Sequence, residues 1–166
     1  PPGRFANFPG TAFCAACPPG RFLGFGGAVS FDQCMPCSPG TFGTGPAAGA
    51  CEPCQPGSYQ DLPSETGCKQ CPAATYLPGT RSRAFDDCLT CPSGTFSSTP
   101  GASTCQLCAA GTFAANPRSL QCTPCPKGKY AIGLGNTECM SCPMGTYGAV
   151  PGATSPAQCP LCAPRN

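Results

Sequence analysis

Every cysteine of this chain belongs to a C-x-x-C pair, and the spacing of these pairs limits the fold more than any other feature of the sequence. Neighbouring pairs start either 17 or 20 residues apart along the 166-residue chain. Such a fixed step indicates one small unit repeated in tandem. The nine pairs are Cys14/Cys17, Cys34/Cys37, Cys51/Cys54, Cys68/Cys71, Cys88/Cys91, Cys105/Cys108, Cys122/Cys125, Cys139/Cys142 and Cys159/Cys162.

A glycine and an aromatic residue follow the pairs at fixed positions. If the second cysteine of a pair is position 0, position 5 is Phe or Tyr after each of the first eight pairs, and position 3 is Gly after all of these except one, where Ala74 stands. Pro and Gly after the cysteine predict a β-turn, and the Thr-Phe or Thr-Tyr that follows favours a short strand. A second turn signal precedes the next cysteine, so each unit is expected to form a small irregular hairpin.

The same register gives the expected unit boundaries. The loops after Cys17, Cys71 and Cys142 are three residues longer than the others, and we expect these insertions to lengthen the outer loop without changing the frame. The expected repeats are 17–33, 34–50, 51–67, 68–87, 88–104, 105–121, 122–138 and 139–158, with the end of a truncated repeat at 1–16 and the start of another at 159–166.

The composition excludes an ordinary hydrophobic core. Gly (22), Pro (23) and Cys (18) make up more than a third of the chain, and frequent Gly and Pro interrupt helices and central strands. Burying one Phe contributes about 2–3 kcal/mol, whereas ordering each residue costs about 1–2 kcal/mol, so disulfides must supply much of the stability. We therefore predict small disulfide-rich repeats in an elongated linear array of irregular β-hairpin-like modules. This array has almost no helix, each unit contacts only its neighbours, and each aromatic packs on the disulfide of its own or the adjacent unit.

The conserved register also predicts which cysteines are joined. The glycine and the aromatic lie between the second cysteine of one pair and the first cysteine of the next, so this segment is expected to be the closed loop. The predicted disulfides are Cys17–Cys34, Cys37–Cys51, Cys54–Cys68, Cys71–Cys88, Cys91–Cys105, Cys108–Cys122, Cys125–Cys139 and Cys142–Cys159.

Two cysteines have no partner in this scheme. PPGRF at residues 1–5 repeats residues 18–22 without the preceding cysteine. Cys14 is therefore expected to have lost its partner, and Cys162 opens a loop that does not close before Asn166. We expect both to be unpaired within this chain, which reads as a segment of a longer one.

Other cysteine chemistries fit the pattern less well. C-x-x-C spacing is typical of zinc ribbons, but nine pairs cannot be grouped by twos and the chain contains no His. A thioredoxin-like site needs one such motif at the start of a helix, and an iron–sulfur centre needs four clustered cysteines. We expect no metal and no cofactor.

Several classes of function are excluded or disfavoured. A formal net charge of +2, with 10% charged residues, does not provide the basic stripe of a nucleic-acid binder, and no apolar stretch is long enough to span a membrane. Without His, no Ser-His or Cys-His dyad can form, so the chain is not expected to be an enzyme. Asp86 and Asp87, like Asp32, are expected to cap a loop turn rather than to bind calcium.

The repeat unit has a recognisable counterpart. CPSGTFSSTPGASTCQLC, residues 91–108, resembles the ephrin-receptor-like cysteine-rich repeat and is similar to the first module of tumour-necrosis-factor-receptor repeats. The chain departs from that pattern at Ala74, at Arg21 and Lys129 in place of Thr, and in the final CAPRN. The resemblance implies an extracellular or cell-surface disulfide-bonded module used in tandem. Long arrays of this Ala-, Gly- and Pro-rich kind also look like the mastigoneme-type proteins that build filaments on algal flagella.

Two functions are compatible with these features. The first is a structural spacer or rod segment in a larger extracellular surface or filament protein, whose partners are other parts of the same chain or identical neighbouring subunits. The alternative is a receptor stalk or a ligand- or glycan-binding module, for which the candidate segments are Arg21–Phe31 and the pair Arg81 and Arg83. Possible O-linked glycans are expected at Ser38, Thr99 and Ser155, each followed by Pro.

One backbone angle provides a local expectation. Pro72 is expected at the second position of a type I turn after Cys71, which places Ala74 at the fourth position. This arrangement predicts a negative φ for Ala74.

Overall fold

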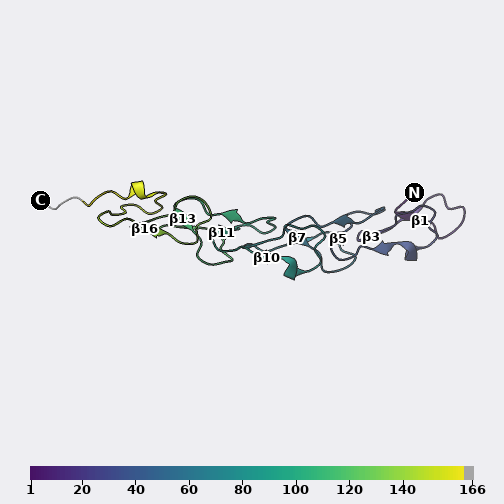
Figure 1. Ribbon diagram of the computed structural model, residues 1–166. Coiled ribbons are helices and arrows are strands. Elements are labelled where there is room, and N and C mark those ends of the chain that lie inside the picture. Colours follow the sequence, from purple (N-terminus) through teal and green to yellow (C-terminus); the bar gives the residue numbers. More distant parts are fainter. Residues whose placement is uncertain (163–166) are drawn as a thin grey trace. The chain divides into compact units, whose positions relative to one another are not determined.

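The computed structural model describes residues 1–162, so the final APRN, which is the last part of the expected unit 159–166, lies outside the described residues. The described part is built from two-residue strands that pair into eight separate antiparallel hairpins, drawn as short arrows in Figure 1. The first strands of the hairpins are β1 (Arg4–Phe5), β3 (Arg21–Phe22), β5 (Thr41–Phe42), β7 (Ser58–Tyr59), β9 (Thr75–Tyr76), β11 (Thr95–Phe96), β13 (Thr112–Phe113) and β15 (Lys129–Tyr130).

The second strand of every hairpin lies inside a C-x-x-C motif. These strands are β2 (Ala15–Ala16), β4 (Met35–Pro36), β6 (Glu52–Pro53), β8 (Lys69–Gln70), β10 (Leu89–Thr90), β12 (Gln106–Leu107), β14 (Thr123–Pro124) and β16 (Met140–Ser141). Side chains alternate between the two faces of a strand, so cysteines three residues apart point to opposite sides. One cysteine is therefore placed to close the loop before the strand, and the other to open the next loop.

The three-residue insertions form short 3-10 helices just before the closing cysteine. These are η1 (Phe31–Gln33), η2 (Phe85–Asp87) and η3 (Pro156–Gln158). At η1, the Gln33 side-chain oxygen accepts hydrogen bonds from the backbone N–H groups of Val29 (2.7 Å) and Ser30 (3.2 Å). Asp87 accepts the equivalent pair of bonds at η2, and at η3 Gln158 accepts one, from the backbone N–H of Thr154 (2.6 Å).

The hairpins fall into two compact units, and the division runs through the repeat closed by Cys71–Cys88. The first unit comprises Pro1–Cys71 and Leu77–Cys88, and the second comprises Pro72–Tyr76 and Leu89 onward. Within the first unit, the hairpins that begin with β1, β3, β5 and β7 follow one another in chain order (Figure 1). The fold class expected from the sequence is confirmed in its essential points, namely disulfide-stapled hairpin modules with almost no helix.

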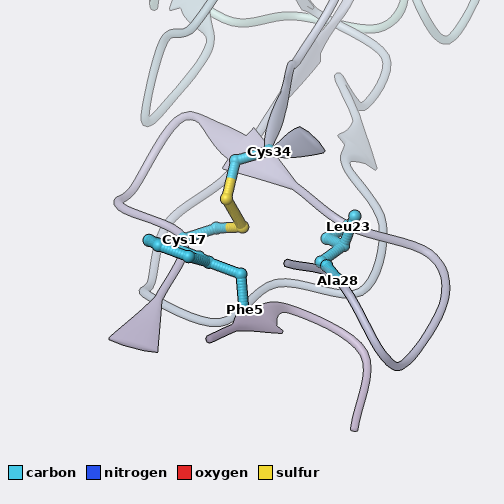
Figure 2. Packing of buried hydrophobic residues seen from close by; sticks show 5 residues of the cluster. All are labelled: Phe5, Cys17, Leu23, Ala28 and Cys34. Carbon is cyan, nitrogen blue, oxygen red and sulfur yellow. A yellow bond between two sulfur atoms is a disulfide. The ribbon is translucent and has the colours of Figure 1, made fainter. Parts of the chain in front are cut away.

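Buried side chains form small local clusters. Phe5 packs against the Cys17–Cys34 disulfide of the following repeat, together with Leu23 and Ala28 (Figure 2). A second cluster joins Tyr59 to Cys71, Leu77 and Cys88. At both places the aromatic side chain covers the disulfide of the adjacent repeat, as expected. Among residues 1–162, no helix has the length and apolar character needed to cross a bilayer.

Candidate functional site

The cysteines lie in the closed loops of the repeats. In each disulfide, the Cα atoms of the two cysteines are 5.6–5.9 Å apart, and the cysteines are separated by 14 or 17 residues in sequence. Cys14 and Cys162 are free and exposed. The disulfides of the structure are Cys17–Cys34, Cys37–Cys51, Cys54–Cys68, Cys71–Cys88, Cys91–Cys105, Cys108–Cys122, Cys125–Cys139 and Cys142–Cys159.

Backbone groups join each repeat to the next. The N–H of Gly20, at position 3, donates to the carbonyl oxygen of Gly43 (2.9 Å), and the Gly20 carbonyl accepts from the N–H of Cys37 (2.9 Å). The N–H of Leu23, at position 6, donates to the carbonyl of Ala48 (3.0 Å). The equivalent bonds recur in the second unit, for example from Gly94 to Ala114 (2.8 Å).

A fourth backbone bond links position 10 of six repeats to the preceding repeat. The N–H of Ala47 donates to the carbonyl of Cys17 (2.9 Å), and the N–H of Arg118 donates to the carbonyl of Cys91 (2.9 Å). All four bonds use main-chain atoms alone. The junctions that have all four bonds therefore share one geometry although the side chains of their repeats differ.

Position 10 also has a positive φ throughout the chain, and sequence analysis missed this feature. The residues there are Gly10, Gly27, Ala47, Ser64, Arg81, Gly101, Arg118, Gly135 and Gly152. Glycine is the residue that adopts positive φ without steric cost. Glycine occupies five of these nine positions. Its recurrence was the one signal in the sequence for a positive φ, but the Ala, Ser and Arg residues at the other four positions obscured it.

Contacts extend beyond the adjacent repeat, so the expectation that each unit contacts only its neighbours is wrong. The Cα of Gly3 lies so close to Ala47, two repeats further on, that a Cβ at residue 3 would overlap the Ala47 carbonyl. The same approach occurs between Gly20 and Ser64. The sequence did not reveal these contacts because they depend on how successive hairpins stack.

The prediction for Ala74 is also wrong, because its φ is +64°. The turn begins one residue later than expected, since the N–H of Thr75 donates to the carbonyl of Pro72 (3.3 Å). Ala74 thus occupies the third position of the turn, where a type II turn requires positive φ. Its N–H donates to Ser97 (2.8 Å) and its carbonyl accepts from Cys91 (3.1 Å), so the bonds between repeats hold the residue in this conformation.

The hydroxyl group at position 4 stabilises the same turn. Thr41 Oγ1 donates to the carbonyl of Ser38 (2.7 Å), and the equivalent Thr, or Ser58, does so in several other repeats. Arg21 lacks this hydroxyl and instead donates from Nη1 to the carbonyl of Cys34 (2.7 Å), with its guanidinium 5.2 Å from the centre of the Phe31 ring.

The candidate segment Arg21–Phe31 is partly occupied by contacts within the fold. Phe31 also packs edge-on against Phe5, with 6.0 Å between ring centres, whereas Phe25 is exposed. The second candidate, Arg81 and Arg83, lines a surface hollow in the first unit. The possible glycan sites Ser38 and Thr99 are exposed, and Ser155 is half-buried.

Of the acidic residues expected to cap a turn, Asp87 does so, whereas the capping side chains at η1 are Ser30 and Gln33. The Asp87 carboxylate accepts from the backbone N–H groups of Arg83 (2.9 Å) and Ala84 (3.1 Å). The N–H of Asp32 donates to Ser30 Oγ (3.2 Å), whose hydroxyl donates to the Asp32 carboxylate (3.1 Å). Asp86 is exposed.

One ion pair, Lys69 to Asp61 at 2.6 Å, is found in the part of the chain that the structure describes. The hydrogen bond from Lys69 lowers the pKa of Asp61, and the bond to Asp61 raises the pKa of Lys69. Both side chains are more than 40% exposed, so water screens the interaction strongly.

Comparison with known proteins identifies the repeat. A family model described as tyrosine-protein kinase ephrin type A/B receptor-like matches residues 40–88 and 111–159, together more than half of the chain. Both matched segments begin at a position 3 glycine and end at a cysteine that closes one of the long loops. No curated protein matches the chain.

Proposed function

Because this chain belongs to the ephrin type A/B receptor-like family, we propose that it is a structural spacer within a larger extracellular surface or filament protein. The observation that carries the proposal is the junction between repeats, in which four main-chain hydrogen bonds recur at equivalent positions at five junctions, three in the first unit and two in the second. A junction that depends little on side chains allows many repeats to be joined in series. The function is then to set the distance between the parts that the array connects.

Second-neighbour contacts support a stiff array. A chain of modules that touch only their neighbours can bend at every junction. Here the position 3 glycine is packed against the position 10 carbonyl two repeats further on, as for Gly94 with Gly135 and for Gly111 with Gly152. Each such contact restrains two successive junctions at once, which favours a fixed distance over a flexible linker.

The proposed location follows from the chemistry of the cysteines. Eight disulfides in a chain of this length are stable in oxidising compartments and are rare where thiols are kept reduced. The buried clusters contain only a few residues each, so the fold depends on the disulfides for its stability. Both points favour the cell surface or the extracellular space.

A series of proteins with different numbers of repeats tests the spacer function. Deletion of residues 105–121 removes one repeat and keeps the 14-residue step between the new cysteine partners, and duplication of the same segment adds one. Small-angle X-ray scattering then gives the maximum dimension of each protein. We expect the maximum dimension to change by the same amount for each repeat that is removed or added.

The control is a Gly-Ser insertion with the same mass as one repeat, placed between the exposed Thr99 and Pro100. It adds no repeat and should leave the maximum dimension nearly unchanged. An unchanged dimension in the repeat series would contradict the proposal.

A second candidate function, ligand or glycan binding, is favoured by one observation. Arg81 and Arg83 line a hollow that also contains Phe22 and Ser38. Gly is the commonest residue at the position of Arg81 and Thr at the position of Arg83, and Arg118 is the other arginine at the first of these positions. Cations at both positions occur together only in this repeat, which distinguishes it from the rest of the array.

A further inference from the structure

We propose that this hollow in the first unit binds the acidic group of a carboxylated or sulfated saccharide, an activity that goes beyond the spacer function. The hollow has a volume of about 300 Å³, at the lower end of the range for small-molecule sites. It is shallow and suits one sugar residue of a longer chain. Its lining residues are Phe22, Ser38, Pro39, Thr41, Cys51, Arg81 and Arg83.

Residues from different repeats line the hollow, so it is built by the stacking of hairpins. Phe22 comes from β3, and Ser38, Pro39 and Thr41 come from the turn that begins the next hairpin. Arg81 approaches this turn from two repeats further on, because its carbonyl packs against Gly40. The second-neighbour contact thereby holds the backbone of Arg81 beside the serine and the proline.

The backbone of Arg81 is in an unfavourable conformation for an arginine. Its φ is +60°, at a position where five of nine residues are glycine, and its N–H is held by the carbonyl of Cys54 (2.9 Å). The non-glycine residues Ala47, Ser64 and Arg118 have the same positive φ at this position, so the conformation belongs to the repeat and fixes the backbone of Arg81 beside the hollow. Two residues later, Arg83 stands at position 12, which is Thr in three other repeats, at Thr66, Thr137 and Thr154.

The electrostatics of the hollow favour an anion. Both arginines are exposed, and no carboxylate is among the residues that line the hollow. The nearest acids in sequence are Asp86, which is exposed, and Asp87, which accepts from the backbone N–H groups of Arg83 and Ala84. Neither arginine forms an ion pair in the part of the chain that the structure describes, so both guanidinium groups are available to donate paired hydrogen bonds to a bound oxyanion.

The remaining lining favours a sugar as the carrier of that anion. Phe22 and Pro39 provide apolar surface for the C–H face of a pyranose ring, and the exposed Ser38 hydroxyl is available to a ring hydroxyl. The Thr41 hydroxyl is used within the turn, where it donates to the Ser38 carbonyl. A site with a small apolar face, one hydroxyl and two cations matches an acidic sugar better than a bare inorganic ion, which would leave the apolar face uncovered.

Titration calorimetry of the whole chain with defined hexasaccharides tests the proposal. The probes are a sulfated, a uronate and a neutral hexasaccharide, together with sodium sulfate and a hexaglutamate peptide. We expect the sulfated or the uronate hexasaccharide to bind, and the stronger of the two identifies the acidic group. The neutral sugar, the sulfate ion and the peptide should each bind at least about ten-fold more weakly.

Two double variants distinguish binding in the hollow from nonspecific attraction to the positive charge of the protein. Arg81→Gly with Arg83→Thr introduces only residues that other repeats carry at these positions, so the fold should be retained. The matched control, Arg118→Gly with Lys127→Ser, removes two exposed cations in the second unit, and Arg118 has nearly the same φ (+62°) as Arg81. The first variant should lose at least about ten-fold in affinity, and the control should stay within about two-fold of the unmodified chain.

Several results would overturn the proposal. They are equal losses in the two double variants, equal binding of the neutral hexasaccharide, tighter binding of hexaglutamate, and no binding of either acidic hexasaccharide. None of these results changes the increments expected in the repeat-number series. The failure of this site and the failure of the spacer function can therefore be told apart.

Discussion

Glycine at position 3 is required for two separable reasons, positive φ and the close approach of another repeat. The recurrence of this glycine was visible in the sequence, but its cause was not. A type I turn was expected to tolerate Ala74, whereas the structure has a turn that requires positive φ at this residue. The φ of Ala74 shows that the conformation, rather than the glycine, is common to the repeats. Close approach could not be predicted, because it depends on a carbonyl group two repeats away.

Alanine at two position 3 glycines separates these causes. Gly111 and Gly128 have φ values of +79° and +80°, but a Cβ at residue 111 would overlap the carbonyl of Gly152, whereas a Cβ at residue 128 meets nothing within 4 Å. Gly128→Ala should cost about 1–2 kcal/mol, the backbone penalty alone. Gly111→Ala should cost clearly more, as measured by denaturant unfolding. Equal losses of unfolding free energy in the two variants would show that the close approach does not contribute to stability.

The Asp61–Lys69 pair gives a prediction for pH. The folded-state pKa of Asp61 is lowered, so its contribution to stability is present above the unfolded-state pKa and is lost as the pH falls through the folded-state value. The folded-state pKa of Lys69 is raised, so its contribution to stability is present below the unfolded-state pKa and is lost as the pH rises through the folded-state pKa. In Lys69→Gln, the pKa of Asp61 measured by carbon NMR should rise toward its ordinary value. An unchanged pKa would show that the pair does not form in solution.

At the scale of the element, the hairpin was predictable and its second strand was not. Turn residues after the cysteine and the Thr-aromatic pair indicated the first strand, and this is where β5 and β11 lie. The second strand consists of pairs as different as Glu52–Pro53 and Lys69–Gln70, which have no shared strand propensity. Backbone pairing and the flanking cysteines impose the extended conformation there.

The 3-10 turns of the long loops depend on a side chain that precedes the closing cysteine. Gln33→Ala removes the acceptor for the N–H groups of Val29 and Ser30 and should cost about 1 kcal/mol, as for the loss of a helix cap. Gln121 also precedes a closing cysteine but lies in a short loop without the inserted residues, so Gln121→Ala is the control and should cost little. Thermal unfolding compares the two variants, and equal shifts would contradict the capping role.

At the scale of the whole molecule, stability is distributed over local clusters and disulfides. The chain divides into two compact units, and its buried residues are mostly half-cystines and alanines. The buried clusters each join one repeat to the next. The sequence indicated this distribution because Gly, Pro and Cys leave few residues for a shared core. It could not indicate second-neighbour packing, which makes stability less local than a nearest-neighbour array would be.

Loss of one disulfide should therefore have an effect of limited range. Replacement of Cys91 and Cys105 by Ser opens a 14-residue loop and should cost about 3 kcal/mol. Hydrogen exchange should then accelerate in that repeat and in those within two repeats of it, and remain slow in repeats such as 17–34. Acceleration along the entire chain would indicate a single cooperative core instead.

The account rests on closed loops that run from the second cysteine of one pair to the first cysteine of the next. Mass spectrometry of the unreduced, alkylated protein tests this most directly, with peptic cleavage and electron-transfer fragmentation to assign each bridge. We predict eight bridges, each lowering the mass by two hydrogens, with alkylation only at Cys14 and Cys162. Bridges within a C-x-x-C motif, bridges that skip a repeat, or a mass that includes bound zinc would contradict the account.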